Sequence, residues 1–480
     1  MTDLLSSPTL KAMTNHLNPA AVFSTARSVL EEVAAEAKNV ATERRMPDIA
    51  ELSERIAARL KTMPLPQSPQ LVNATGVLFP SDIAFSELPV KAIDRMVASF
   101  GGELPDQQPP KTANVREMIC ELTGASDAVV VNGHAAALLL TFAAFTRHGR
   151  YDVVTTPGDL YEAMTGYRID GMMRLADCVP LTVGSLTRAT LDDYAVGTND
   201  ETAILYCANR IDACLAVERN LPELSQLADF ARKRNLPLVF DAEWSSFHAT
   251  EDYGLKGIPT CRDLMKQGVS LLIFSCGGLN GCDFAAATDH GSDTPNATVL
   301  MRRCAPAVIT GDKSLIRDIR KSPLFPVFVP SRHDMAALEA VLSLSMTRES
   351  AENELPIWQL LSTDNENLKL RADRMAMQIA VIPGVTDVSV VASFAQLTPL
   401  RPRYCIPSQE VRVTFAAKTA VEMCAALAAY HSAQGQAGIA VTGVPDQSNT
   451  IALNLRTVFA KYDMLITEAL IDLMTENVIE

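Results

Sequence analysis

The feature that most constrains the fold of this chain is an alternation of short apolar runs with helical segments, which starts near residue 71. The clearest runs are Ala128–Asn132, Asp152–Thr156, Ala203–Cys207, Pro237–Asp241 and Ser270–Phe274. Near-continuously apolar strands separated by amphipathic helices are typical of a parallel sheet that helices cover on both faces. We therefore predict an α/β domain around a mostly parallel sheet over residues 68–330.

Two further regions flank this domain. Residues 1–67 are predicted to be helical, because Phe23–Arg45 and Ile49–Met63 carry apolar residues at helical spacing and contain no glycine or proline. After residue 331 a long helix, Met335–Ser350, leads into several strand–helix alternations. This pattern predicts a small C-terminal α+β domain over residues 331–480.

Composition excludes several classes of protein. Hydrophobic residues make up 48% of the chain and charged residues 20%, which is a globular composition. We expect no signal peptide, because the N-terminus has no basic region followed by an apolar run. We expect no membrane span, because no stretch reaches about 18 uninterrupted apolar residues. The ten cysteines form no C-x-x-C pair, so neither a metal site nor a disulfide framework is expected, and a reducing cytoplasm is the simplest location. A net charge of −14 weighs against a nucleic-acid-binding face.

The segment Val129–Leu140 predicts a strand, a tight turn at Asn132, Gly133 and His134, and a helix. The free N–H groups and the dipole at such a helix start attract a phosphate. Any strand–loop–helix unit has this form, however, so an ordinary turn and a structural His134 stay open as alternatives.

Two other strand ends carry candidate residues. Asp241 ends an apolar run, where a carboxylate could pair with a protonated ring nitrogen of a ligand or cap a helix. Gly268–Phe284 predicts a buried strand that enters a glycine-rich turn, flanked by the thiols of Cys276 and Cys282. Such a turn either admits a ligand closely or is only a turn.

Taken together, these segments resemble bacterial selenocysteine synthase, the L-seryl-tRNA(Sec) selenium transferase, and its lyase relatives that use pyridoxal 5′-phosphate (PLP). The segments that carry the likeness are Leu71–Phe79, Leu122–Leu140, Gly158–Met173, Leu236–Trp244, Gly268–Ser275, Met335–Leu342 and Ile451–Val458. The resemblance implies the fold-type-I PLP-dependent transferase fold, with a large sheet domain, a small C-terminal domain and an obligate dimer that often assembles further.

The resemblance also assigns candidate cofactor-binding residues. Asn132, Gly133 and His134 fall in what looks like the phosphate-cradling turn of the family. Asp241 falls on the carboxylate that pairs with the pyridine nitrogen. Two more residues, Glu162 and Arg168, resemble residues near the cofactor and the substrate.

The chain departs from the family where the chemistry should occur. The family follows its strand with Ser-Gly-Asp-Lys-Leu-Leu-Gly-Gly, and the lysine forms the Schiff base. Here the segment is Ser275–Gly281, and Gly278 stands at the lysine position. Three other family motifs are also replaced, around Pro80–Phe85, Gln108–Thr112 and Asn209–Ala213.

Lys313 offers an alternative, because Thr310–Ser314 looks like the missing lysine motif displaced by an insertion. Pro306–Leu324 fits better as the family's next strand and helix. That assignment leaves roughly twenty extra residues around Thr288–Arg303, which we predict to form a surface loop.

Glycine has no side chain that could form an imine, so we expect no covalently bound PLP, while non-covalent PLP stays open. The prediction is a selenocysteine-synthase-like pseudoenzyme, with no assigned catalytic residue, that acts as a homodimer or higher homo-oligomer or with an active paralogue. One alternative is an active lyase or transferase on an amino acid or aminoacyl-tRNA that uses Lys313. Another is a PLP-independent enzyme that uses the old pocket through Cys276 or Cys282. The N-terminal region carries eight basic and eight acidic residues, which speaks against tRNA as a partner.

Overall fold

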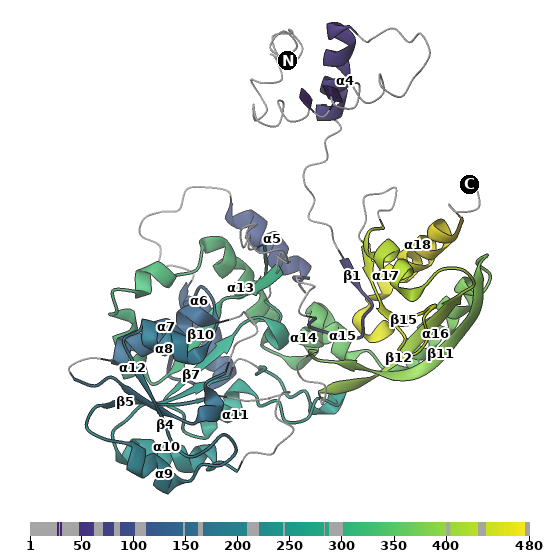
Figure 1. Ribbon diagram of the computed structural model, residues 1–480. Coiled ribbons are helices and arrows are strands. Elements are labelled where there is room, and N and C mark those ends of the chain that lie inside the picture. The colour runs from purple at the N-terminus through teal and green to yellow at the C-terminus, as the bar shows by residue number, and fades with distance from the viewer. Residues whose placement is uncertain are drawn as a thin grey trace. The chain divides into compact units, whose positions relative to one another are not determined.

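The computed structural model describes most of the chain after residue 70 (Figure 1). The described residues are 26–27, 29–30, 48–61, 71–80, 87–100, 112–146, 149–161, 167–208, 220–242, 245–282, 284–287, 301–399, 404–430 and 438–475. The chain divides into two compact units, Met1–Gln70 and Leu71–Glu480. The predicted domain boundaries near residues 67 and 330 stay predictions.

Within the first unit, the structure describes the helix α4, Ile49–Lys61. Its first turn is closed by reciprocal bonds, from the Glu51 amide to Asp48 Oδ1 (2.9 Å) and from the Asp48 amide to Glu51 Oε2 (3.1 Å). This helix confirms the second of the two helices predicted from the sequence. Most of the other one, Phe23–Arg45, lies outside the described residues.

The second unit is built on a seven-stranded sheet in the order β2-β10-β7-β6-β5-β3-β4. Its strands are β2 Asp127–Val131, β3 Asp152–Thr155, β4 Val179–Thr182, β5 Thr202–Ala208, β6 Leu238–Asp241, β7 Leu271–Ser275 and β10 Ala307–Gly311. β10 runs antiparallel to both of its neighbours, and every other pairing is parallel. The predicted α/β architecture is therefore confirmed.

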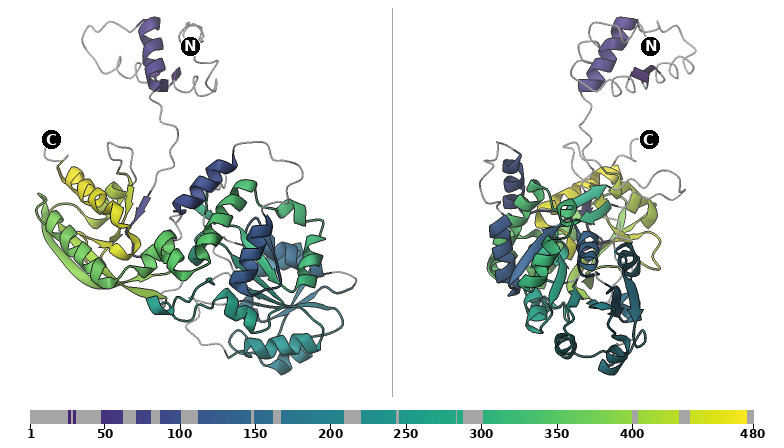
Figure 2. Two further views of the ribbon diagram at one scale, coloured as in Figure 1. Left: turned by 180° about the vertical axis from the view of Figure 1, so that it is seen from behind. Right: turned by 90° about the vertical axis from the view of Figure 1, so that its left-hand side faces the viewer.

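Helices cover both faces of this sheet, as the two views of Figure 2 show. One face carries α7 His134–Phe145, α8 Ile169–Leu175 and α12 Lys313–Arg320. The opposite face carries α6 Thr112–Thr123, α9 Leu191–Gly197, α10 Leu224–Lys233, α11 Cys261–Lys266 and α13 Arg332–Ser345, and α5 Val90–Ser99 packs against α13. Along β7, Leu271 and Ile273 face the first layer, and Leu272 and Phe274 face the second. Because both faces of the sheet are buried, the strand does not alternate between apolar and polar residues and is apolar along most of its length.

The C-terminal part of the second unit forms its own layer (Figure 1). A four-stranded antiparallel sheet has the order β11-β12-β15-β14. The elements here are α14 Arg348–Glu354, α15 Pro356–Ser362, α16 Asn365–Ile379, β11 Val385–Gln396, β12 Cys405–Phe415, α17 Ala420–Ala428, β13 Gly438–Ala440, β14 Thr442–Gly443, β15 Thr450–Asn454 and α18 Asp463–Thr475. β1, Leu71–Asn73, pairs in parallel with β13, so the start of the predicted large domain is joined to the predicted small one.

Two further observations bear on the sequence predictions. The predicted loop around Thr288–Arg303 lies mostly outside the described residues, but its last residues belong to β9, Met301–Cys304, which pairs antiparallel with β8, Phe284–Ala287. In the described part of the chain, no helix is both long enough and apolar enough to cross a bilayer.

Candidate functional site

The candidate site lies where the parallel strands end, an edge of the central sheet that we call the carboxyl edge. β2 ends at Val131, β6 at Asp241 and β7 at Ser275. Ligands of open α/β sheets bind at this edge, because loops there can diverge and helix N-termini point toward it. The fold brings five predicted site residues to this edge. Asp241 is the last residue of β6, and the other four follow the ends of β2 and β7: Asn132, Gly133, His134 and Gly278.

Asp241 is the centre of a hydrogen-bonded cluster. Its side chain is fully buried, with 0% exposed. Oδ1 accepts a bond from Nε2 of His134 at 2.7 Å, and Oδ2 accepts bonds from the hydroxyls of Tyr206 at 2.8 Å and Tyr161 at 3.1 Å. A buried carboxylate needs such donors, because burial removes the water that would otherwise solvate it. We call Asp241, His134, Tyr161, Tyr206 and Tyr167 the Asp241 cluster.

His134 is held at both of its ring nitrogens. The second nitrogen, Nδ1, lies 2.5 Å from the hydroxyl of Tyr167, and the side chain is 9% exposed. His134 is the first residue of α7, and the tight turn before it uses Gly133 at φ +105°, a conformation that favours glycine. This turn aims the imidazole from the end of β2 across to the end of β6.

Tyr206 stays protonated in this environment. Burial, followed by the charge of Asp241, raises the pKa of the Tyr206 phenol well above its ordinary value. The hydroxyl therefore acts as a hydrogen-bond donor to Asp241. Tyr206 reaches it from β5, the strand next to β6, where Ala208 is the register partner of Asp241.

The predicted phosphate turn already uses part of its donor capacity. The amide of Asn132 donates to the carbonyl of Phe328 at 2.7 Å, and the amide of Gly133 donates to the carbonyl of Val131 at 2.9 Å. A phosphate at a helix start is held by backbone N–H groups, so two of those in this turn are engaged within the protein.

Gly278 begins the short 3-10 helix Gly278–Asn280, just beyond the end of β7. Its φ of +61° lies in the left-handed region, where a side chain would be strained. Asn280 anchors this turn by donating to the carbonyls of Ser275 and Ser245 at 2.8 and 3.4 Å, and Trp358 Nε1 donates to the carbonyl of Leu279 at 2.8 Å. The turn is a packed, hydrogen-bonded structure built for glycine at this position.

Of the other two predicted site residues, Arg168 directly follows Tyr167 of the Asp241 cluster but has an exposed side chain, and Glu162 is not described. Arg168 precedes α8, is 66% exposed and forms an ion pair with Asp170 (Nε–Oδ1 3.0 Å). Through its hydrogen bonds, Arg168 lowers the pKa of the Asp170 carboxyl. Glu162 lies outside the described residues.

Lys313 lies at the opposite edge of the sheet. β10 is antiparallel to β7 and pairs Ala307 with Ser275 and Gly311 with Leu271, so the chain returns to the amino end of β7 before Lys313. At about 3.3 Å per residue, a five-residue strand separates the two edges by roughly 16 Å. Lys313 is exposed there as the first residue of α12.

The distribution of the other lysines along the chain bears on the same question. None of the thirteen lysines lies between Lys111 and Lys233 or between Lys266 and Lys313, the segments that hold the carboxyl ends of β2, β3, β4, β5 and β7. The segment that follows the carboxyl end of β6 carries one lysine, Lys256, whose side chain is exposed. Lys233 and Lys266 are the last residues of α10 and α11, helices that lead back toward the amino ends of the strands. Lys111 lies outside the described residues.

The two candidate thiols are buried. Cys276 is 1% exposed and Cys282 is 0% exposed. Their backbones close the glycine-rich turn, because the Cys282 amide donates to the carbonyl of Cys276 at 2.9 Å and the Cys276 amide to that of Pro306 at 2.8 Å. A nucleophilic cysteine needs access to its substrate, so this burial favours a structural role.

Sequence reasoning missed the three tyrosines of the Asp241 cluster. Tyr206 is the one residue with a hydroxyl group inside the run Ala203–Cys207, and Tyr161 and Tyr167 lie on either side of the predicted site residue Glu162. A polar side chain within a fully buried strand is a signal that could have drawn attention to Tyr206, since buried hydroxyls are almost always bonded.

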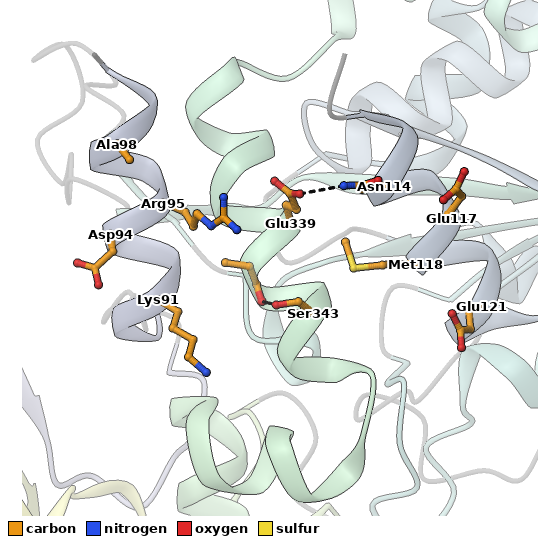
Figure 3. Close-up of a pocket in the computed structure, with 11 residues that line it drawn as sticks. Lys91, Asp94, Arg95, Ala98, Asn114, Glu117, Met118, Glu121, Glu339 and Ser343 are labelled. Atoms are coloured by element: carbon orange, nitrogen blue, oxygen red, sulfur yellow. Dashed lines mark hydrogen bonds between the residues drawn. The ribbon is translucent and has the colours of Figure 1, made fainter. Parts of the chain in front are cut away.

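A separate cavity of about 640 Å³ lies between α5, α6 and α13, away from the Asp241 cluster (Figure 3). Both signs of charge line it, with Lys91 and Arg95 on α5, Glu117 and Glu121 on α6, and Glu339 on α13. None of the predicted site residues belongs to its lining. Across the described ranges, no group of three or more His, Cys, Asp or Glu side chains could hold a metal ion.

The sequence of this chain is similar to those of L-seryl-tRNA selenium transferases. The family model described as L-seryl-tRNA selenium transferase matches residues 98–287 and 299–458. The L-seryl-tRNA(Sec) selenium transferase of Serratia proteamaculans is 28% identical over 339 residues, which cover 69% of this chain and 68% of that protein. The one from Geotalea uraniireducens is 28% identical over 417 residues, covering 84% and 83%.

Among solved structures, a D-glucosaminate-6-phosphate ammonia-lyase superposes with a TM-score of 0.56 at 17% identity, covering 90% of this chain and 99% of that one. At that identity the likeness shows the fold alone. The architecture is the fold-type-I PLP-dependent transferase fold that the sequence predicted.

Proposed function

Because this chain belongs to the L-seryl-tRNA selenium transferase family, we propose that it is a member that has lost Schiff-base chemistry and acts through assembly. It pairs with itself, or with an active paralogue whose site it completes or regulates. The cytoplasm is its proposed location. Neither a metal nor a covalently bound cofactor takes part.

The observation that carries this proposal is the glycine at residue 278. PLP in this fold is held as an imine with a lysine amine, which activates it for covalent chemistry. Gly278 supplies no amine, and its φ of +61° is unfavourable for any residue that could. The described residues also supply Asp241 with three internal donors, one on Oδ1 and two on Oδ2. The carboxyl edge therefore does not fit a covalently held PLP.

Two alternatives are weaker on geometric grounds. An active lyase or transferase that uses Lys313 would need this amine at the carboxyl edge, yet it lies at the amino edge of the sheet. A PLP-independent enzyme that uses Cys276 or Cys282 would need an accessible thiol, and both are buried.

The direct test uses the purified native chain, incubated with PLP and then reduced with borohydride. We expect no aldimine absorbance band that borohydride abolishes, and no stoichiometric pyridoxyl adduct on any one lysine by peptide mass spectrometry. Traces spread over several exposed lysines are the expected background of a reactive aldehyde. A single fully modified lysine, at Lys313 or elsewhere, would refute the proposal.

The assembly part has its own test. We expect light scattering to give the mass of a dimer or a larger oligomer. Mixing with an active L-seryl-tRNA(Sec) selenium transferase should give either no exchange, for self-assembly, or a mixed complex with an altered rate of selenium transfer. A monomer that forms no mixed complex would contradict this part.

A further inference from the structure

One side chain connects the two places that a pyridine phosphate would need. The backbone of His134 belongs to the predicted phosphate turn at the start of α7. Its ring ends on Asp241, with Nε2 at 2.7 Å from Oδ1. The imidazole therefore bridges the turn and the carboxylate.

The imidazole is also fixed in this position. Its Nδ1 bonds with the hydroxyl of Tyr167 while Nε2 bonds with Asp241, so rotation about the side chain would break both bonds at once. Rotation would also leave Oδ1 of a fully buried carboxylate without the donor that now satisfies it. The arrangement thus opposes removal of the ring by a competing ligand.

We propose that His134 is a built-in occupant of the old cofactor position and excludes pyridine phosphates, whether bound covalently or not. Its ring N–H donates to Asp241 where a protonated pyridine nitrogen would donate. This inference rests on the proposed function for the identity of the site and adds a second, independent barrier to the missing lysine. A lysine restored to the turn would not by itself restore the cofactor.

The test uses pyridoxine 5′-phosphate, which has the ring nitrogen and the phosphate but no aldehyde and so cannot form an imine. Calorimetric titration compares the native chain with His134→Ala. We expect the variant to bind at least about 10-fold more tightly than the native chain, because Asp241 gains a vacant acceptor. If His134→Ala does not fold, as judged by circular dichroism and thermal unfolding, the smaller polar change His134→Asn replaces it.

Two further variants test whether the gain in affinity for the probe arises at Asp241. Tyr167→Phe removes the outer bond of the imidazole but keeps its bond with Asp241, so its gain in affinity for the probe should be much smaller than that of His134→Ala. Adding Asp241→Asn to His134→Ala should remove most of the gained affinity. A gain that survives this change would mean that the probe binds elsewhere, and the inference would be wrong.

The outcomes separate this inference from the proposed function. If the native chain binds the probe as tightly as His134→Ala, the histidine does not exclude the ligand, yet the absence of a lysine adduct would still support the lost Schiff-base step. A stoichiometric lysine adduct in the native chain would overturn both. Failure of His134→Ala to gain affinity would overturn the exclusion alone.

Discussion

At the scale of single residues, Asp241 shows how side-chain donors stabilise a buried carboxylate. Three donors reach its two oxygens from β5, from the start of α7 and from the segment that holds Tyr161. A hydrogen bond to a charged group contributes about 1.5–3 kcal/mol, and an unsatisfied buried group costs a comparable amount. Removing any one donor should therefore destabilise the fold as well as alter the site.

Tyr206→Phe tests whether loss of one donor to Asp241 destabilises the fold. Tyr206 is chosen because its pKa is raised, which also predicts a pH dependence. We expect it to lower the free energy of unfolding by about 1–3 kcal/mol near pH 7, measured by urea unfolding. Burial and the charge of Asp241 raise the pKa of Tyr206, so its contribution is fully present below the ordinary value of about 10 and is lost as pH rises above it.

The difference between the native chain and Tyr206→Phe should accordingly shrink above about pH 10. Tyr151→Phe, at a half-exposed ring, is the matched control and should change stability by less than about 0.5 kcal/mol at neutral pH. A difference for Tyr206→Phe that grows with alkaline pH would be inconsistent with a bonded, neutral phenol.

At the scale of elements, the antiparallel strand β10 decides where Lys313 lies. Its direction sends the chain back to the amino edge, and α12 begins there. Arg320, at the end of α12, secures the helix to the first residue of β2 through two bonds to the Asp127 carboxylate, at 2.7 and 2.8 Å, and one to the carbonyl of Ala128 at 2.8 Å. This contact keeps α12, and with it Lys313, away from the Asp241 cluster.

Arg320→Ala should lower the free energy of unfolding by about 2–4 kcal/mol, because it leaves the carboxylate of Asp127, 2% exposed, without its main partner. Arg317→Ala, at an exposed position of the same helix, should cost less than about 0.5 kcal/mol. Urea unfolding of both variants at neutral pH gives the comparison. Equal effects would show that the ion pair contributes little.

The same pair predicts a response to acid. Burial raises the pKa of Asp127, but the bonds from Arg320 and from the Ala128 amide outweigh it, and the pKa lies below its ordinary value. The stabilisation is therefore present above about pH 4 and lost as pH falls further, so the native chain and Arg320→Ala should converge in acid.

At the scale of the whole molecule, charge sets what the protein can bind. The chain carries a net charge of −14. Proteins that hold tRNA neutralise many phosphates with lysine and arginine, and their affinity depends on those contacts. The proposed assembly role requires no such surface, which distinguishes it from the reaction that the names of its relatives state.

We predict no specific binding of seryl-tRNA at physiological salt, measured by the anisotropy of a fluorescently labelled tRNA. An active L-seryl-tRNA(Sec) selenium transferase serves as the positive control under the same conditions. Binding by this chain that matches the control would show that tRNA recognition outlived the loss of the lysine, and the role of the protein would then include tRNA.

The sequence by itself determined the local content of the fold. Apolar runs indicate which strands are buried on both faces, so β2, β3, β5, β6 and β7 could be predicted from the sequence. The glycine at residue 278 was also identified from the sequence alone. β4 was missed because it is a partly exposed edge strand with the sequence Val179–Thr182, which contains a proline.

Only the tertiary structure decided which side chains meet. The donors to Asp241 lie 35, 80 and 107 residues away along the chain, and nothing local couples them. Strand order and register bring Tyr206 beside Asp241, and the turn at Gly133 aims His134 across the sheet. Strand direction likewise put Lys313 at the far edge. The periodicity of apolar residues along the chain indicates which side chains are buried. Which side chains meet across strands depends on the order, register and direction of the strands, and these are properties of the assembled sheet.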